Sequence, residues 1–119
     1  MFSGGPGQDQ IKGNSLTATG TLMTVPAGHL LTANVQLTAS IAVAGNCAPT
    51  ISVSGNNAAP ASGTILCRLF VSGLALATVA DSTEFEILVK APPENDITIQ
   101  FTAGASGSST ATLNGWVTT

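Results

Sequence analysis

Apolar and polar residues alternate along most of this chain with a period of two. The longest run covers residues 29–44 (HLLTANVQLTASIAVA). Successive side chains of a strand point to opposite faces, whereas an amphipathic helix needs apolar residues at spacings of three and four, which this run lacks. The pattern therefore predicts one long strand with a single buried face. That face consists of Leu31, Ala33, Val35, Leu37, Ala39, Ile41 and Val43.

Shorter alternating segments follow one another along the rest of the chain, separated by clusters of Pro, Gly and Asn that favour turns. The further strands are expected near residues 16–22, 51–53, 74–76, 85–89, 97–101 and 111–117. Residues 64–71 (TILCRLFV) differ because, apart from Arg68, they are apolar at both parities. This pattern predicts a strand covered on both faces, either central in a sheet or buried in an oligomer.

About eight short strands with regular turn signals, and no segment with a helical period, predict an all-β protein. We expect an antiparallel β-sandwich, with an eight-stranded jelly roll as the first choice and a seven-stranded immunoglobulin-like sandwich as the alternative. Periodicity does not determine the strand order. The sandwich is expected to span residues 15–119 as one domain.

The first 14 residues (MFSGGPGQDQIKGN) are rich in Gly and Gln, a composition that cannot build a core of its own. We expect residues 1–14 to form an extended arm. Phe2 and Ile11 are its candidate anchors for binding a partner. Such an arm gains affinity when its backbone adds a strand to a neighbour's sheet.

Charged residues make up 8% of the chain, against about 25% in an average soluble domain. Interface cores are depleted in charge because desolvating a charged side chain is costly, so this composition favours an assembly subunit. The net charge is −3, and the only bases are Lys12, Arg68 and Lys90. We therefore expect no nucleic acid and no anionic membrane as partner. The start of the chain has no signal-peptide pattern and no window reaches 18 apolar residues, so neither export nor a membrane span is expected.

Candidate chemistry is sparse, and a non-enzymatic protein without cofactor, metal or catalytic residue is expected. His29 is the single histidine and follows a predicted turn. Cys47 and Cys67 lack a zinc spacing, so we interpret them as buried small hydrophobes, with a disulfide in an oxidising compartment as the alternative. The pairs Glu84/Glu86 and Glu94/Asp96 supply too few oxygen ligands for calcium and are interpreted as solvated charge.

Trp116 is the single tryptophan of a chain without tyrosine. We interpret it as a core or interface anchor. The alternative is a platform on which a sugar ring stacks, flanked by Gly115 and Val117.

Two stretches resemble virion proteins. Residues 22–43, with the turn Val25-Pro26-Ala27-Gly28-His29 before a long alternating strand, resemble the opening of small virion β-sandwich proteins. Residues 95–99 (NDITI) and 114–117 (NGWV) are similar to the last strands of trimeric jelly rolls. Together they resemble the head decoration, or cement, proteins of tailed bacteriophages. The resemblance carries no diagnostic motif and assigns no site residue.

This resemblance implies a small jelly-roll subunit, often a homotrimer, that is clamped over joints between major capsid proteins. It implies a place on the capsid exterior of the virion after synthesis in the host cytoplasm. Two other classes share the fold: a receptor-binding or adhesive domain of a fibre tip or cell surface, and a carbohydrate-binding module. A glycan array tests the last of these, whereas a cement protein co-purifies stoichiometrically with capsid shells.

Partner binding should depend only weakly on salt, because so few charges are present to be screened. Across a tenfold range of ionic strength, the affinity for the partner is expected to change by less than about tenfold. Affinities measured at each salt concentration check this. A fall of several decades would reveal a charged interface.

Overall fold

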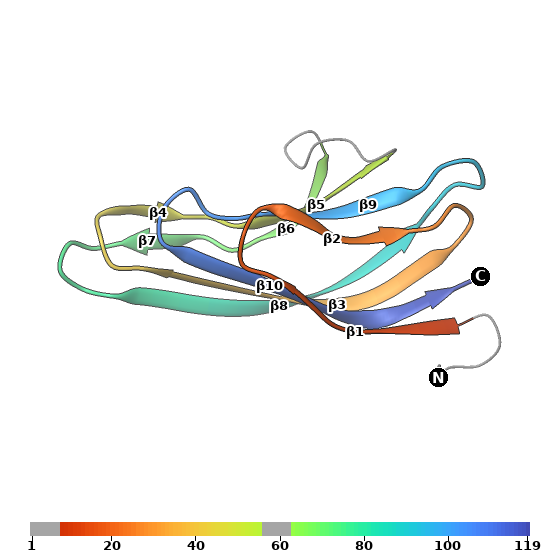
Figure 1. The fold of residues 1–119 in the computed structure, drawn as a ribbon. Helices are drawn as coiled ribbons and strands as arrows, with labels where there is room; N and C mark the ends of the chain where they lie inside the picture. The colour runs from red at the N-terminus through yellow and green to blue at the C-terminus, as the bar shows by residue number, and fades with distance from the viewer. Residues whose placement is uncertain (1–7, 56–62) are drawn as a thin grey trace.

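The computed structural model describes residues 8–55 and 63–119, and within them every regular element is a strand. The all-β expectation is confirmed. Two four-stranded sheets face each other, and a short two-stranded sheet extends one end (Figure 1). The strands are β1 (Gln8–Leu16), β2 (Gly20–Val25), β3 (Leu30–Ile41), β4 (Gly45–Cys47), β5 (Thr50–Gly55), β6 (Thr64–Arg68), β7 (Val71–Gly73), β8 (Val79–Lys90), β9 (Ile97–Thr102) and β10 (Ser108–Thr118).

The strand order is that of a jelly roll. The first sheet has the order β1-β10-β3-β8, the second has the order β2-β9-β5-β6, and β4 pairs with β7. All these pairs are antiparallel, and those of the eight main strands are nested: β1 with β10, β2 with β9, β3 with β8 and β5 with β6. The chain thus folds as one long hairpin that is rolled into two layers. The eight-stranded jelly roll is confirmed over the immunoglobulin-like alternative.

β3 is an interior strand of the first sheet and lies between β10 and β8. It pairs with β10 and with β8 along unbroken registers that run from Leu30 to Ser40 and from Leu30 to Ile41, respectively. Its odd-numbered residues are buried from Leu31 to Ile41, as the alternation predicted. Val43 was wrongly assigned to this face. The strand ends at Ile41 and the chain leaves the ladder, so the Val43 side chain is exposed.

The core lies between the two sheets and is built from aliphatic side chains with Phe101. The second sheet contributes Ile51, Ile99 and Phe101, all fully buried. β9 is buried on both faces: Thr98 and Gln100 on its other face are also covered, and Gln100 Oε1 accepts a hydrogen bond of 3.2 Å from Thr21 Oγ1. β9 is therefore the doubly covered strand of this fold.

Residues 64–71 do not form a central strand, and that expectation is wrong. β6 is the last strand of the order β2-β9-β5-β6, and in residues 8–55 and 63–119 its one pairing partner is β5. Cys67 faces the core, but Ile65 and Leu66 are exposed. The apolar character of both faces therefore does not arise from burial within the chain. The other reading, burial in an oligomer, stays a prediction.

Part of the predicted arm belongs to the sandwich. β1 begins at Gln8 and pairs with β10, with a bulge between Ile11 and Asn14 at which Gly13 adopts a φ of 72°. Strand pairing thus starts before the predicted boundary at residue 15. Backbone hydrogen bonds to β10 do not require apolar side chains, so the composition gave no sign of this strand. Residues 1–7, including Phe2, lie outside the described residues.

Gly28 and Gly107 form a matched pair for a stability test, because both have φ near 75° but different surroundings. A Cβ atom at Gly28 would meet nothing within 4 Å, whereas one at Gly107 would overlap the carbonyl oxygen of Ser40. Gly28→Ala should cost about 1–2 kcal/mol through its left-handed backbone. Gly107→Ala should cost about 2–5 kcal/mol, because overpacking is added to the same strain.

Denaturant unfolding of both variants measures the difference. Equal losses of unfolding free energy would show that the close approach of β3 to the β9–β10 turn does not constrain the fold.

Candidate interaction surface

The polar residues singled out in the sequence hold turns together. His29 Nδ1 donates a hydrogen bond of 2.9 Å to the carbonyl oxygen of Ala27 in the β2–β3 turn. Asp96 Oδ1 accepts a hydrogen bond of 2.9 Å from the backbone N–H of Ala27. This bond connects the β8–β9 turn to the β2–β3 turn. Within residues 8–55 and 63–119, no group of three or more His, Cys, Asp or Glu side chains is placed to hold a metal ion. The absence of enzymatic activity stays a prediction.

Glu84 and Glu86 of β8 lie on the outer face of the first sheet. Glu84 Oε1 accepts a hydrogen bond of 2.7 Å from Gln36 Nε2 on β3, and Glu84 and Glu86 are both exposed. This agrees with their interpretation as solvated charge.

Both cysteines are buried free thiols, as expected for small hydrophobes, and the alternative disulfide is not formed. Cys47 Sγ lies 3.7 Å from the carbonyl oxygen of Ser108, to which it donates. Burial raises the pKa of the Cys67 thiol to about 11, although a hydrogen bond with the Ile51 backbone opposes the shift. Cys67 is therefore a neutral, poorly nucleophilic thiol at neutral pH.

Exposed apolar side chains gather at one edge and one end of the sandwich. We define the apolar edge as Ile65, Leu66 and Phe70, on and just after β6. We define the apolar tip as Val43, Leu74 and Leu76, in the β3–β4 and β7–β8 loops. Their exposed fractions run from 39% for Leu66 to 102% for Leu76.

The apolar tip is formed by two loops beside the β4–β7 sheet, at the left end of the sandwich in Figure 1. Leu76 has a φ of 63°, which is unusual for a bulky residue, in the turn closed by the bridge between Leu74 and Ala77. Residues 69–80 (LFVSGLALATVA) include no charged residue. A strained, fully exposed leucine in such surroundings indicates a contact surface. Exposing a large apolar side chain to water is unfavourable, and covering it with a partner removes that cost.

The apolar edge combines exposed side chains with an exposed strand. Within the described residues, β6 has β5 on one side and no strand on the other in its sheet. An edge strand offers backbone donors and acceptors to another chain unless charge or a covering loop blocks it. Arg68 at the end of β6 is the one charge in this strand. The edge is therefore suited to pairing with a strand of a partner.

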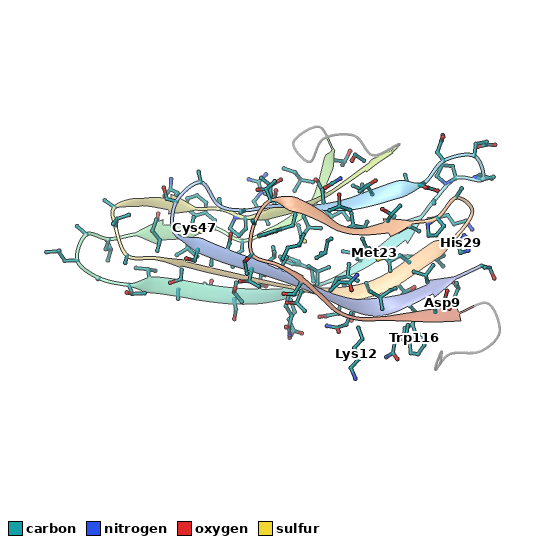
Figure 2. All side chains as sticks on the ribbon, viewed as in Figure 1. Asp9, Lys12, Met23, His29, Cys47 and Trp116 are labelled. Carbon is teal, nitrogen blue, oxygen red and sulfur yellow. The ribbon has the colours of Figure 1, made fainter. Side chains whose placement is uncertain are left out.

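Ile11 and Trp116, the two predicted anchors among the described residues, lie on opposite faces of the first sheet. Ile11 packs in part against the core. Trp116 is half-buried on the outer face, where Figure 2 shows it pointing away from the sandwich as Lys12 does. Trp116 is therefore not a core anchor. Alternation could have shown this, because Leu113 and Val117 share the inward parity and Trp116 has the other.

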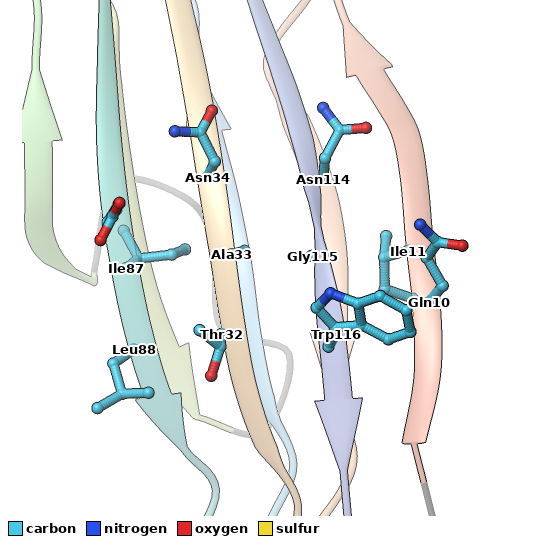
Figure 3. A pocket seen from close by; sticks show the side chains of 11 residues that line it. Gln10, Ile11, Thr32, Ala33, Asn34, Ile87, Leu88, Asn114, Gly115 and Trp116 are labelled. Carbon is cyan, nitrogen blue, oxygen red and sulfur yellow. The ribbon is translucent and has the colours of Figure 1, made fainter. Parts of the chain in front are cut away.

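An open groove of about 660 Å³ lies beside Trp116 on this outer face (Figure 3). Its floor is the backbone at Ala33 and Gly115. Besides these and Trp116, it is lined by Gln10, Ile11, Thr32, Asn34, Glu86, Ile87, Leu88 and Asn114. From the sequence, Trp116 of this groove was named as a core or interface anchor or a sugar platform, and Ile11 as an anchor of the arm. The groove as a whole, the apolar edge and the apolar tip were not identified as sites.

Comparisons with known proteins give fold likenesses only. No protein-family model and no curated protein matches the chain. A pentameric capsid protein isolated from metagenomic phage sequences is similar at 16% identity and a TM-score of 0.44, over 94% of this chain and 58% of that one. The structure of infectious bursal disease virus strain Gx is similar at 18% identity and a TM-score of 0.41, over 93% and 31%. A CBM4 structure is similar at 12% identity and a TM-score of 0.36, over 91% and 59%. This chain thus spans less than two thirds of each of these chains.

Where the chain is described, no helix is long and apolar enough to cross a membrane.

The raised pKa of Cys67 predicts slow alkylation and a loss of stability in alkali. The native thiol keeps its proton above pH 9.0 while the unfolded thiol loses it, so this contribution is complete below pH 9.0 and is lost as the pH rises towards about 11. Cys67→Ala should remove that part of the alkaline loss, and Cys47→Ala is the control. Unfolding followed from pH 8 to pH 11 tests this, and identical pH profiles for wild type and Cys67→Ala would contradict it.

Proposed function

We propose that this chain is a structural virion protein that decorates and cements a capsid by binding across neighbouring major capsid subunits. The observation that carries the proposal is the gathering of exposed apolar side chains. Of the large exposed hydrophobics in the described part of the chain, all but Leu88 belong to the apolar edge or the apolar tip. A domain with 8% charged residues is also inexpensive to desolvate when a partner covers it.

The apolar tip and edge can supply useful affinity. Burying a Leu, Val or Phe side chain contributes roughly 1.5–3 kcal/mol relative to leaving it exposed. Part of this gain is offset by the ordering of side chains and by the loss of free motion on association. Backbone hydrogen bonds from β6 to a strand of the partner would add affinity without requiring charges.

The layout of the sandwich supports bridging between two subunits. β1 begins at Gln8 at the opposite end of the sandwich from the apolar tip (Figure 1). An arm preceding β1, anchored by Phe2, would therefore reach one neighbour while the tip contacts another. Assembly as a homotrimer, which we favour, would link three such sets of contacts and raise the overall affinity through effective concentration. The site of action would be the capsid exterior.

Substitutions at the tip test the proposal most simply. Leu74→Ser with Leu76→Ser removes two exposed apolar side chains without disturbing the core. Binding to shells of the virus that encodes the chain should weaken at least about tenfold, in line with the loss of one well-buried leucine or more. Leu88→Ser is the matched control, since Leu88 is 70% exposed, a value between those of Leu74 and Leu76, but lies on the outer face of the first sheet.

Co-sedimentation with shells that lack the endogenous protein gives the stoichiometry and the affinity. The proposed contact surface is wrong if the double variant binds as tightly as wild type, or if Leu88→Ser alone abolishes binding.

A further inference from the structure

The groove beside Trp116 has a regular arrangement that follows from the strand registers. Gln10, Trp116, Thr32 and Leu88 lie opposite one another across β1, β10, β3 and β8 and form one row. Asn114, Asn34 and Glu86 form the next row on the same face. The rows are two residues apart along each strand, or about 7 Å. An aromatic and apolar row therefore runs beside a polar row.

The polar row combines hydrogen-bond donors with acceptors. Asn114 Oδ1 accepts a hydrogen bond of 2.7 Å from the backbone N–H of Gly13 at the bulge of β1. This contact fixes the amide so that its NH₂ group points towards β3, as Figure 3 shows. The Asn34 amide can donate and accept, and the Glu86 carboxylate accepts only. The row is therefore suited to hydroxyl groups, which themselves both donate and accept.

The floor of the groove allows a ligand to approach the sheet closely. Its centre is formed by Gly115 and Ala33, which are opposite each other in the register. The half-buried Trp116 indole lies on one side, and the exposed Leu88 lies on the other (Figure 3). A saturated ring that presents apolar C–H groups on one face can stack on the indole while hydroxyl groups at its edge reach the polar row. A ligand with both properties is a pyranose sugar.

The charge of the groove indicates whether a neutral or an anionic sugar fits it better. Glu86 is the one charged residue among those that line the groove. A negative group beside the ligand disfavours sialylated, sulfated or uronic-acid sugars, so a neutral glycan fits best. Ile11 and Ile87 pack towards the core, so Leu88 is the one exposed aliphatic side chain in the lining of the kind that forms the apolar edge and tip. The groove is thus chemically distinct from the proposed capsid contact.

We propose that this groove binds a neutral oligosaccharide, with Trp116 as the stacking platform and Asn34, Glu86 and Asn114 as the hydrogen-bonding row. A decoration protein with such a site would attach its particle to surface glycans. The site itself does not depend on the proposed capsid function, because all its residues lie in one chain and away from the apolar edge and tip.

Trp116 is the only tryptophan of the chain, so its fluorescence reports on the groove alone. The full-length protein is titrated with neutral oligosaccharides of glucose, mannose, galactose and N-acetylglucosamine, and calorimetry on the same pairs gives the affinities. At least one of these four classes should produce a saturable change in Trp116 emission at millimolar concentration or below. A sialylated oligosaccharide should bind more weakly than its neutral parent.

Variants separate a built site from loose contact with an indole. Asn34→Ala and Glu86→Gln keep the fluorophore and should each weaken binding at least fivefold, whereas the Leu74→Ser, Leu76→Ser protein should bind as wild type does. Absence of a saturable response to all four classes would overturn the proposal, as would responses that Asn34→Ala and Glu86→Gln both leave unchanged. Neither result would bear on shell binding, which is measured separately.

Discussion

The backbone ladder that β3 forms with β10 and β8 is the interaction on which the rest of the structure depends. It joins three long strands without a bulge and aligns the buried face of β3 with Leu113 of β10 and with Ile87 and Val89 of β8. The second sheet packs on this continuous apolar face. Because side chains alternate, the same ladder also fixes the outer face, including the two rows around the groove.

The nested pairing that extends this ladder also decides which surfaces remain uncovered. The middle pair of the hairpin, β5 with β6, leaves β6 at the edge of the second sheet with Ile65 and Leu66 exposed. The connections from β3 to β5 and from β6 to β8 run past the end of the sandwich, pair as β4 with β7, and carry the apolar tip. The sandwich therefore has a well-packed core and a surface whose large exposed apolar side chains, apart from Leu88, lie at the apolar edge and the apolar tip. That distribution is typical of a subunit that is completed by its neighbours.

Much of the fold could be predicted because the period of two reflects local side-chain geometry. The buried face of β3 is an example. The positions of Val43 and of β6 could not be predicted in this way, since strand ends and sheet order depend on contacts between distant segments. β1 was not predicted because it pairs with β10 through main-chain hydrogen bonds. Such pairing does not require the alternating apolar residues by which the other strands were found. The polar residues of the groove could not be predicted because their proximity arises from the registers of four strands. Trp116 was named from the sequence as a core or interface anchor, with a sugar platform as the alternative, and parity alone could have placed it outside the core.

The central claim is that the apolar edge and tip are covered in the assembled particle. Hydrogen exchange of the protein alone and on its shell measures this directly, because backbone amides that become paired or buried exchange more slowly. Protection should increase in β6 and in the loops that carry Val43, Leu74 and Leu76, and should remain unchanged along β3. Unchanged exchange in β6 and both loops, with new protection confined to the outer face of the first sheet, would contradict the account.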